Sequence, residues 1–96
     1  MSDKRAVAER FGANVRHYKE QRGLSLTLLA QRAGIHRTQV GLVIRGKRVV
    51  QIDTLIKLAS ALEVPPGALL DGITWKPEQP GPPGKFELAD PGTMLE

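Results

Sequence analysis

The apolar positions near the N-terminus repeat with the period of an amphipathic helix. They are spaced 3, 4 and 3 residues apart, which places them on one face of a helix. These residues are Ala8, Phe11, Val15 and Tyr18. The pattern predicts a helix over residues 4–22, with Ser2 or Asp3 accepting from the free amides at its start and Gly23 providing a left-handed stop. We expect its apolar face to lie in the core.

Four shorter helices are predicted downstream, over residues 26–32, 36–45, 53–62 and 65–70. Ser25 is a good N-cap for the first of them, and Gly34 ends it. In the second, Val40 and Val43 fall on the inner side. The third carries its apolar residues on one face: Leu55, Leu58, Ala59 and Leu62. No segment before residue 72 alternates with period two, so the predicted fold is all-α with five helices.

Residues 73–96 differ in composition from the helical part. They contain five of the seven prolines, so we expect a C-terminal extension rather than core helix. Two short stretches in it alternate apolar and polar residues, and antiparallel pairing would place Ile73 and Trp75 on one face with Phe86 and Leu88. Lys76 and Glu87 can then meet on the other face, and a long proline-rich loop joins the strands. The extension is either such a β-ribbon or a flexible tail.

A lone two-stranded ribbon is only marginally stable in water, so its apolar face needs cover. The cover comes either from the last two helices of the same chain or from a second subunit. In the second case Trp75, Phe86 and Leu88 are dimer or partner contacts, and the extension is a dimerisation arm.

The charge of the chain is unevenly distributed. Residues 1–72 carry 12 Lys and Arg against 6 Asp and Glu, a net charge of +6, whereas residues 73–96 carry 2 against 4, a net charge of −2. No acidic residue lies between Glu20 and Asp53, a stretch that contains six basic residues: Arg22, Arg32, Arg37, Arg45, Lys47 and Arg48. Such a stretch indicates a polyanionic partner, either nucleic acid or an anionic membrane surface, unless it is simply a solvated face.

The same composition argues against several kinds of chemistry. The chain has no cysteine, which excludes disulfides, zinc–thiolate sites and thiol nucleophiles. Its two histidines are 19 residues apart and match no metal-ligand spacing, and no Ser–His–Asp pattern, phosphate-binding loop or carboxylate cluster indicates an enzyme. We expect no cofactor and no metal. No apolar run is long enough to cross a membrane and no signal region is visible, so a soluble cytoplasmic protein is expected.

Three small or β-branched residues mark a helix-turn-helix. Ala30 lets two helices approach closely, Gly34 permits the positive φ of a tight turn, and Val40 is placed to pack back onto Ala30. Two helices joined in this way form the unit whose second helix enters the DNA major groove. The unit covers about residues 25–44.

The surrounding sequence resembles the phage repressor and Cro-like (XRE) helix-turn-helix family over about residues 10–71. The resemblance lies in Gly23-Leu24-Ser25, Leu29-Ala30, Ala33-Gly34-Ile35, Arg45-Gly46-Lys47-Arg48, Asp53-Thr54-Leu55 and Leu58-Ala59 with Leu62. It implies a five-helix DNA-binding domain over residues 1–72 that binds operator DNA, usually as a symmetric dimer.

The resemblance also suggests which residues touch DNA bases. They lie along the predicted second helix of the unit: Arg37, Thr38, Gln39, Gly41 and Leu42. Arg37 can donate bidentately to guanine, and Thr38 and Leu42 can offer methyl groups to thymine. Gln39 could read adenine or contact a phosphate, and Gly41 would let the helix sit deep in the groove.

Phosphate contacts are expected on both sides of that helix. The loop residues Arg45, Lys47 and Arg48 would run along the DNA backbone and fix register without reading sequence. The amides at Ser25 and Leu26 begin a helix and form a natural phosphate site. His36 is either a structural N-cap or a further DNA contact.

Some positions depart from the family pattern. Leu26 replaces a frequent Gln, Leu28 a charged residue and Ile44 a frequent Glu. These three side chains form either an exposed apolar surface for a partner or ordinary core and scattered surface positions.

The favoured function is a sequence-specific transcriptional regulator, a repressor that binds a palindromic operator as a homodimer. An alternative is the antitoxin of a toxin–antitoxin pair, which binds a partner protein and regulates its own gene through DNA binding. A third is a module that keeps the fold and makes only protein contacts, against which the basic stretch argues.

Overall fold

Five helices and a two-stranded ribbon make up the computed structural model, which describes residues 3–77 and 84–89. In chain order they are α1 (Asp3–Gln21), α2 (Leu26–Ala33), α3 (Arg37–Ile44), α4 (Ile52–Leu62), α5 (Pro66–Leu69), β1 (Ile73–Pro77) and β2 (Gly84–Leu88). The five predicted helices are confirmed, with ends that differ by one or two residues. The predicted capping by Ser2 or Asp3 lies outside the described side chains.

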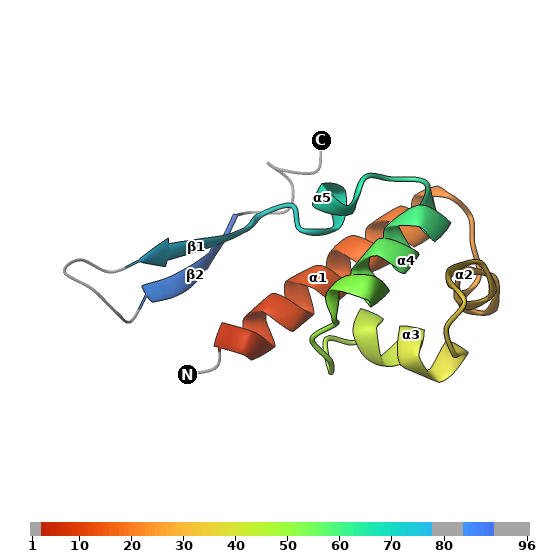
Figure 1. The fold of residues 1–96 in the computed structure, drawn as a ribbon, viewed down its shortest axis with the longest axis horizontal. Helices are drawn as coiled ribbons and strands as arrows, with labels where there is room; N and C mark the ends of the chain where they lie inside the picture. The colour runs from red at the N-terminus through yellow and green to blue at the C-terminus, as the bar shows by residue number, and fades with distance from the viewer. Residues whose placement is uncertain (1–2, 78–83, 90–96) are drawn as a thin grey trace.

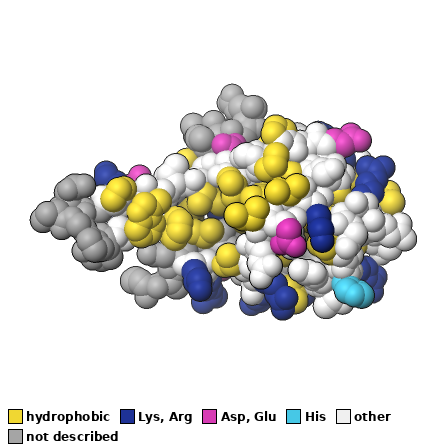
Figure 2. Space-filling view, in the orientation of Figure 1, with side chains coloured by type: hydrophobic (Ala, Val, Ile, Leu, Met, Phe, Trp, Pro, Cys, Tyr) yellow, Lys and Arg dark blue, Asp and Glu magenta, His cyan; other side chains and the backbone are white. Residues whose placement is uncertain are grey.

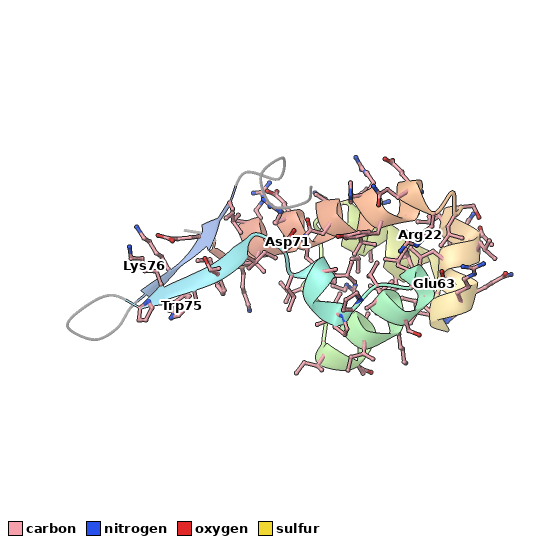
Figure 3. All side chains as sticks on the ribbon, turned by 90° about the horizontal axis from the view of Figure 1, so that it is seen from above. Arg22, Glu63, Asp71, Trp75 and Lys76 are labelled. Carbon is pink, nitrogen blue, oxygen red and sulfur yellow. The ribbon has the colours of Figure 1, made fainter. Side chains whose placement is uncertain are left out.

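Backbone and side-chain caps explain where the helices end. Ser25 caps α2, since its hydroxyl oxygen accepts from the amide of Leu28 at 3.0 Å. Helix α4 ends at Glu63, a non-glycine residue with φ +61°. Arg22 holds this strained end, because its guanidinium donates to the carbonyls of Leu62 at 2.9 Å and Glu63 at 3.3 Å (Figure 3). Arg22 therefore serves the fold, although it was counted in the basic stretch that indicated a polyanion.

The helices pack around one aliphatic core (Figure 1). The largest apolar side chains with no exposed surface come from every helix: Val15, Leu29, Val40, Val43, Leu58, Leu62 and Leu69. Phe11 and Val15 are buried as the first periodicity predicts, and Tyr18 is half-buried against the core. Ala30 is buried in the same cluster as Val40, as the helix-turn-helix spacing requires. Burial of these side chains is what fixes α2 and α3 against the rest of the bundle.

The C-terminal extension forms the predicted antiparallel ribbon, which projects from the bundle beyond one end of α1 (Figure 1). Ile73 pairs with Leu88 and Trp75 with Phe86, so the predicted register is confirmed. On the opposite face, the Lys76 ammonium lies 3.9 Å from the Glu87 carboxylate. The strands include Pro77 and Gly84, and the six residues between them lie outside the described part of the chain.

Candidate nucleic-acid interface

Helices α2 and α3 form a helix-turn-helix. At the turn, Gly34 adopts φ +70°, and the amide of the next residue, Ile35, donates to the carbonyl of Ala30 at 3.1 Å. The inner side of α3 is buried through Val40 and Val43, so its opposite side faces solvent. A short helix held by its inner face and open on its outer face has the geometry that enters a major groove.

The predicted base-reading residues occupy the outer side of α3, with one difference. Arg37 and Thr38 are exposed, and Gln39 and Leu42 are partly exposed. Gly41 is buried, and the Arg45 side chain folds back toward it, since a Cβ at Gly41 would lie 3.1 Å from Arg45 Nη1. Arg45 ends α3 and lies over the face that carries Arg37, instead of extending along the following loop.

The loop after α3 presents a group of cations. Lys47 and Arg48 are exposed and line a shallow depression with Lys4 and Arg5 of α1. Gly46 positions this loop, because it has φ +72° and approaches α1 so closely that a Cβ would lie 2.8 Å from the Cα of Glu9. The sequence did not connect Lys4 and Arg5 with this surface, since they lie about forty residues away along the chain.

Helix N-termini supply the other predicted phosphate sites. The first amides of α2 have no partner within the helix, so those of Leu26 and Thr27 are free to donate. The Ser25 oxygen accepts from Leu28 and keeps its own O–H for donation. His36 is the N-cap residue of α3, but its exposed side chain makes no capping hydrogen bond.

Apart from Arg5, the basic side chains of this surface form no ion pair with the described side chains. Among the side chains that the structure describes, the ion pairs are Arg5–Glu9 at 3.3 Å and Lys76–Glu87 at 3.9 Å. Arg37, Arg45 and Arg48 are therefore available to a polyanion. Figure 2 shows Lys and Arg side chains along the edge of the molecule where α3 and the following loop lie.

One residue that positions α3, Gly12, was not predicted from the sequence. Gly12 of α1 lies against the C-terminal end of α3, and a Cβ there would be 2.2 Å from the carbonyl oxygen of Val43 and 2.8 Å from that of Ile44. Its signal was a glycine in the middle of a predicted helix, where glycine costs stability unless close packing requires it.

The possible apolar partner surface at Leu26, Leu28 and Ile44 is not formed. Leu26 and Ile44 pack against the core, and only Leu28 is exposed, with 38% of its surface open. These positions are therefore core and scattered surface residues. None of the described helices is long and apolar enough to cross a membrane. Likewise, the described residues contain no cluster of three or more side chains that could ligate a metal.

This surface defines a DNA-binding module of the helix-turn-helix class. The helix-turn-helix family HTH_3 matches residues 15–69, more than half of the chain, and the protein belongs to this family. Membership confirms the resemblance to the phage repressor and Cro-like proteins, and it makes the chain a DNA-binding regulator of transcription. The individual DNA contacts stay predictions.

Three relatives illustrate the similarity. The chain is 41% identical over 73 residues to the control protein C.SmaI of Serratia marcescens. The aligned region covers 76% of this chain and 87% of that protein. The restriction-modification controller protein C.AhdI from Aeromonas hydrophila is 39% identical with a TM-score of 0.65, over 67% of this chain and 97% of the other. An HTH_3 family transcriptional regulator from Vibrio cholerae is 30% identical with a TM-score of 0.66, over 69% and 37% of the two chains.

Proposed function

We propose that the protein is a sequence-specific regulator that binds a palindromic operator as a homodimer and represses transcription by occupying a promoter. It acts in the cytoplasm. Because two relatives are control proteins, one of them named for a restriction-modification system, the genes it controls are inferred to be those of such a system. The observation that carries the proposal is the exposed, unneutralised basic surface of α3 and the following loop.

We expect two kinds of DNA contact on this surface, one to bases and one to phosphates. Arg37 stands at the first position of α3, where side chains reach base edges, and its guanidinium can pair with the O6 and N7 atoms of a guanine. Lys47 and Arg48 lie beyond the helix, where they can contact phosphates on either side of the groove. Base contacts supply sequence preference, and phosphate contacts supply affinity and its dependence on salt.

An apolar surface around the start of α4 supports the homodimer. Val49 is 50% exposed, Ile52 75%, Ile56 51% and Leu70 43%. Val49, Ile52 and Leu70 line a largely apolar groove together with the buried Phe11 of α1, and Ile56 lies outside that groove. We call this set of five residues the α4 surface. Aliphatic side chains this exposed indicate an interface, and a second copy of the chain can cover them symmetrically. The sequence did not reveal this surface, because Ile56 lies off the face predicted for the core and Ile52 precedes the helix predicted over residues 53–62.

Selection of binding sites from random DNA duplexes, read at two salt concentrations, tests the proposal. We expect an inverted repeat whose half-sites are centred about one helical turn, ~34 Å, apart. A variant with Ile56→Lys should select the same half-site with much lower affinity, because charge on the α4 surface opposes dimerisation. Failure to enrich any sequence, with a shallow salt dependence, would contradict a sequence-specific role. A fusion of the selected site to a reporter promoter then tests repression.

A further inference from the structure

A buried polar cluster fixes the ribbon to the bundle. Arg10 of α1 is 7% exposed, and its guanidinium donates to the Asn14 side chain at 3.3 Å and to the carbonyl of Ala89, directly after β2. Asn14 is fully buried and donates to the carbonyls of Leu69 at 2.9 Å and Asp71 at 3.0 Å, directly before β1. Both strands are therefore tied to α1 at their bases. These hydrogen bonds within one chain therefore set the direction of the ribbon relative to the bundle.

One face of this ribbon is apolar and open. Trp75 is 51% exposed and Leu88 39% exposed on the face that they share with Phe86. Figure 3 shows Trp75 and Lys76 on opposite sides of the ribbon, and the Lys76 side carries the ion pair to Glu87. The two faces thus differ sharply in chemistry.

The Trp75 ring is held in place although half of it faces solvent. It packs edge-to-face against Phe86, with ring centroids 5.0 Å apart and planes at 71°. Gly84 leaves the room that the indole occupies, because a Cβ there would lie 2.4 Å from Cζ2 of Trp75. A rigid, half-exposed tryptophan is the kind of side chain that contributes most to a protein interface, since little conformational entropy is lost when it is covered.

The apolar face of the ribbon continues into the α4 surface. Ile73, the first residue of β1, lines the same groove as Ile52 and Leu70 and pairs with Leu88 in the ribbon. Figure 2 shows apolar side chains running without interruption from the ribbon onto the bundle, on the side that carries α4 in Figure 1. The two surfaces therefore form one apolar face.

We propose that a second copy of this chain covers the apolar face of the ribbon, so that the ribbon is part of the dimer interface. The inference rests on the proposed homodimer and extends its interface from the α4 surface to Trp75, Phe86 and Leu88. A symmetric dimer needs a self-complementary patch, and a continuous apolar face beside the α4 surface provides it.

The area required supports this assignment. A stable interface buries about 800 Å² on each partner, and the exposed aliphatic side chains of the α4 surface supply part of that area. A half-exposed tryptophan and its neighbours add substantially, because an aromatic side chain buries about 150–250 Å² when fully covered. DNA is a poorer occupant, since the residues that line the groove are apolar except for Arg48 and Gln51, and the other free cations, Arg37, Arg45 and Lys47, lie on α3 and its loop. The ribbon also lies outside residues 15–69, which the family match covers.

Trp75 is the one tryptophan of the chain, so its fluorescence reports directly on this face. We would dilute the full-length protein through the range in which sedimentation shows dimer becoming monomer. Emission should shift to shorter wavelength on dimerisation, with the same midpoint as sedimentation. A dimer whose tryptophan emission stays that of a water-exposed indole would overturn the ribbon's role and leave the homodimer intact. Absence of any dimer would overturn the proposed homodimer itself, and a shift seen only when duplex DNA is added would assign the face to DNA.

Two lysine substitutions on opposite faces of the ribbon give a matched comparison. Leu88→Lys places a charge on the apolar face and should weaken dimerisation at least tenfold, with Trp75 kept as the reporter. Thr74→Lys places the same charge on the exposed polar face, opposite Glu87, and should change the dimer dissociation constant less than twofold. Equal dimer dissociation constants for the two variants, with both folded by circular dichroism, would overturn the proposal.

Discussion

Gly12 is the position where the smallest change should disturb helix α3. A Gly12→Ala substitution adds one methyl group 2.2 Å from the Val43 carbonyl oxygen, more than 1 Å inside the 3.4 Å at which ordinary contact begins. The atoms in the way are backbone at the end of α3, so the helix must move as a unit. Overpacking of this kind costs about 1–3 kcal/mol. It should outweigh the gain of about 1 kcal/mol that alanine brings to a helix interior.

Gly67→Ala is the matched control. Gly67 lies in α5, has no positive φ, and a Cβ there would meet no described heavy atom within 4 Å. Urea unfolding of both variants should show Gly67→Ala unchanged or stabilised by up to about 1 kcal/mol and Gly12→Ala destabilised. Under conditions where it stays folded, Gly12→Ala should also bind the selected operator about tenfold more weakly, the effect of losing about 1.4 kcal/mol of base contacts. Equal unfolding free energies for Gly12→Ala and the native protein would refute the close approach of α1 and α3.

Three further substitutions test other parts of the fold. Ser25→Ala removes the cap of α2 and should lower the unfolding free energy by about 1 kcal/mol, measured by urea denaturation; no loss would show that the cap is not used. Asn14→Leu leaves the carbonyls of Leu69 and Asp71 and the Arg10 guanidinium short of a partner, so about 2–4 kcal/mol should be lost, and native-like stability would contradict the buried cluster. Arg22→Ala should expose the C-terminal carbonyls of α4 and speed amide hydrogen exchange in its last turn, with exchange in α3 as the unaffected reference.

Much of this fold could be predicted because its local signals agree with one another. The spacing of Phe11 and Val15 gave the long helix, Ser25 and Gly34 gave the limits of α2, and alternation gave the ribbon. In each case the pattern within a few residues determines the local structure, because hydrophobic periodicity and backbone conformation point the same way. The pairing of Trp75 with Phe86 followed from the same period-two pattern and from the register that a shared apolar face requires.

The remaining features depend on contacts between distant parts of the chain. Gly12 matters because of a carbonyl more than thirty residues away, and Arg10 because of Ala89 at the base of the ribbon. The folding of Arg45 back over Gly41 is a rotamer choice that sequence spacing does not specify. The exposure of Ile52 was not predicted from the sequence either, since an apolar residue at the start of a helix is ordinarily assigned to the core.

The central proposal is that α3 reads bases whereas the loop after it contacts phosphates. Binding of the native protein, Arg37→Ala and Arg48→Ala to the selected operator and to random duplex, over a series of salt concentrations, tests it directly. Arg37→Ala should lose about 1–3 kcal/mol on the operator, little on random DNA, and its preference at one base position. Arg48→Ala should weaken both DNAs alike and lower the salt slope by about 1. Equal losses on operator and random DNA for Arg37→Ala would contradict base reading by Arg37.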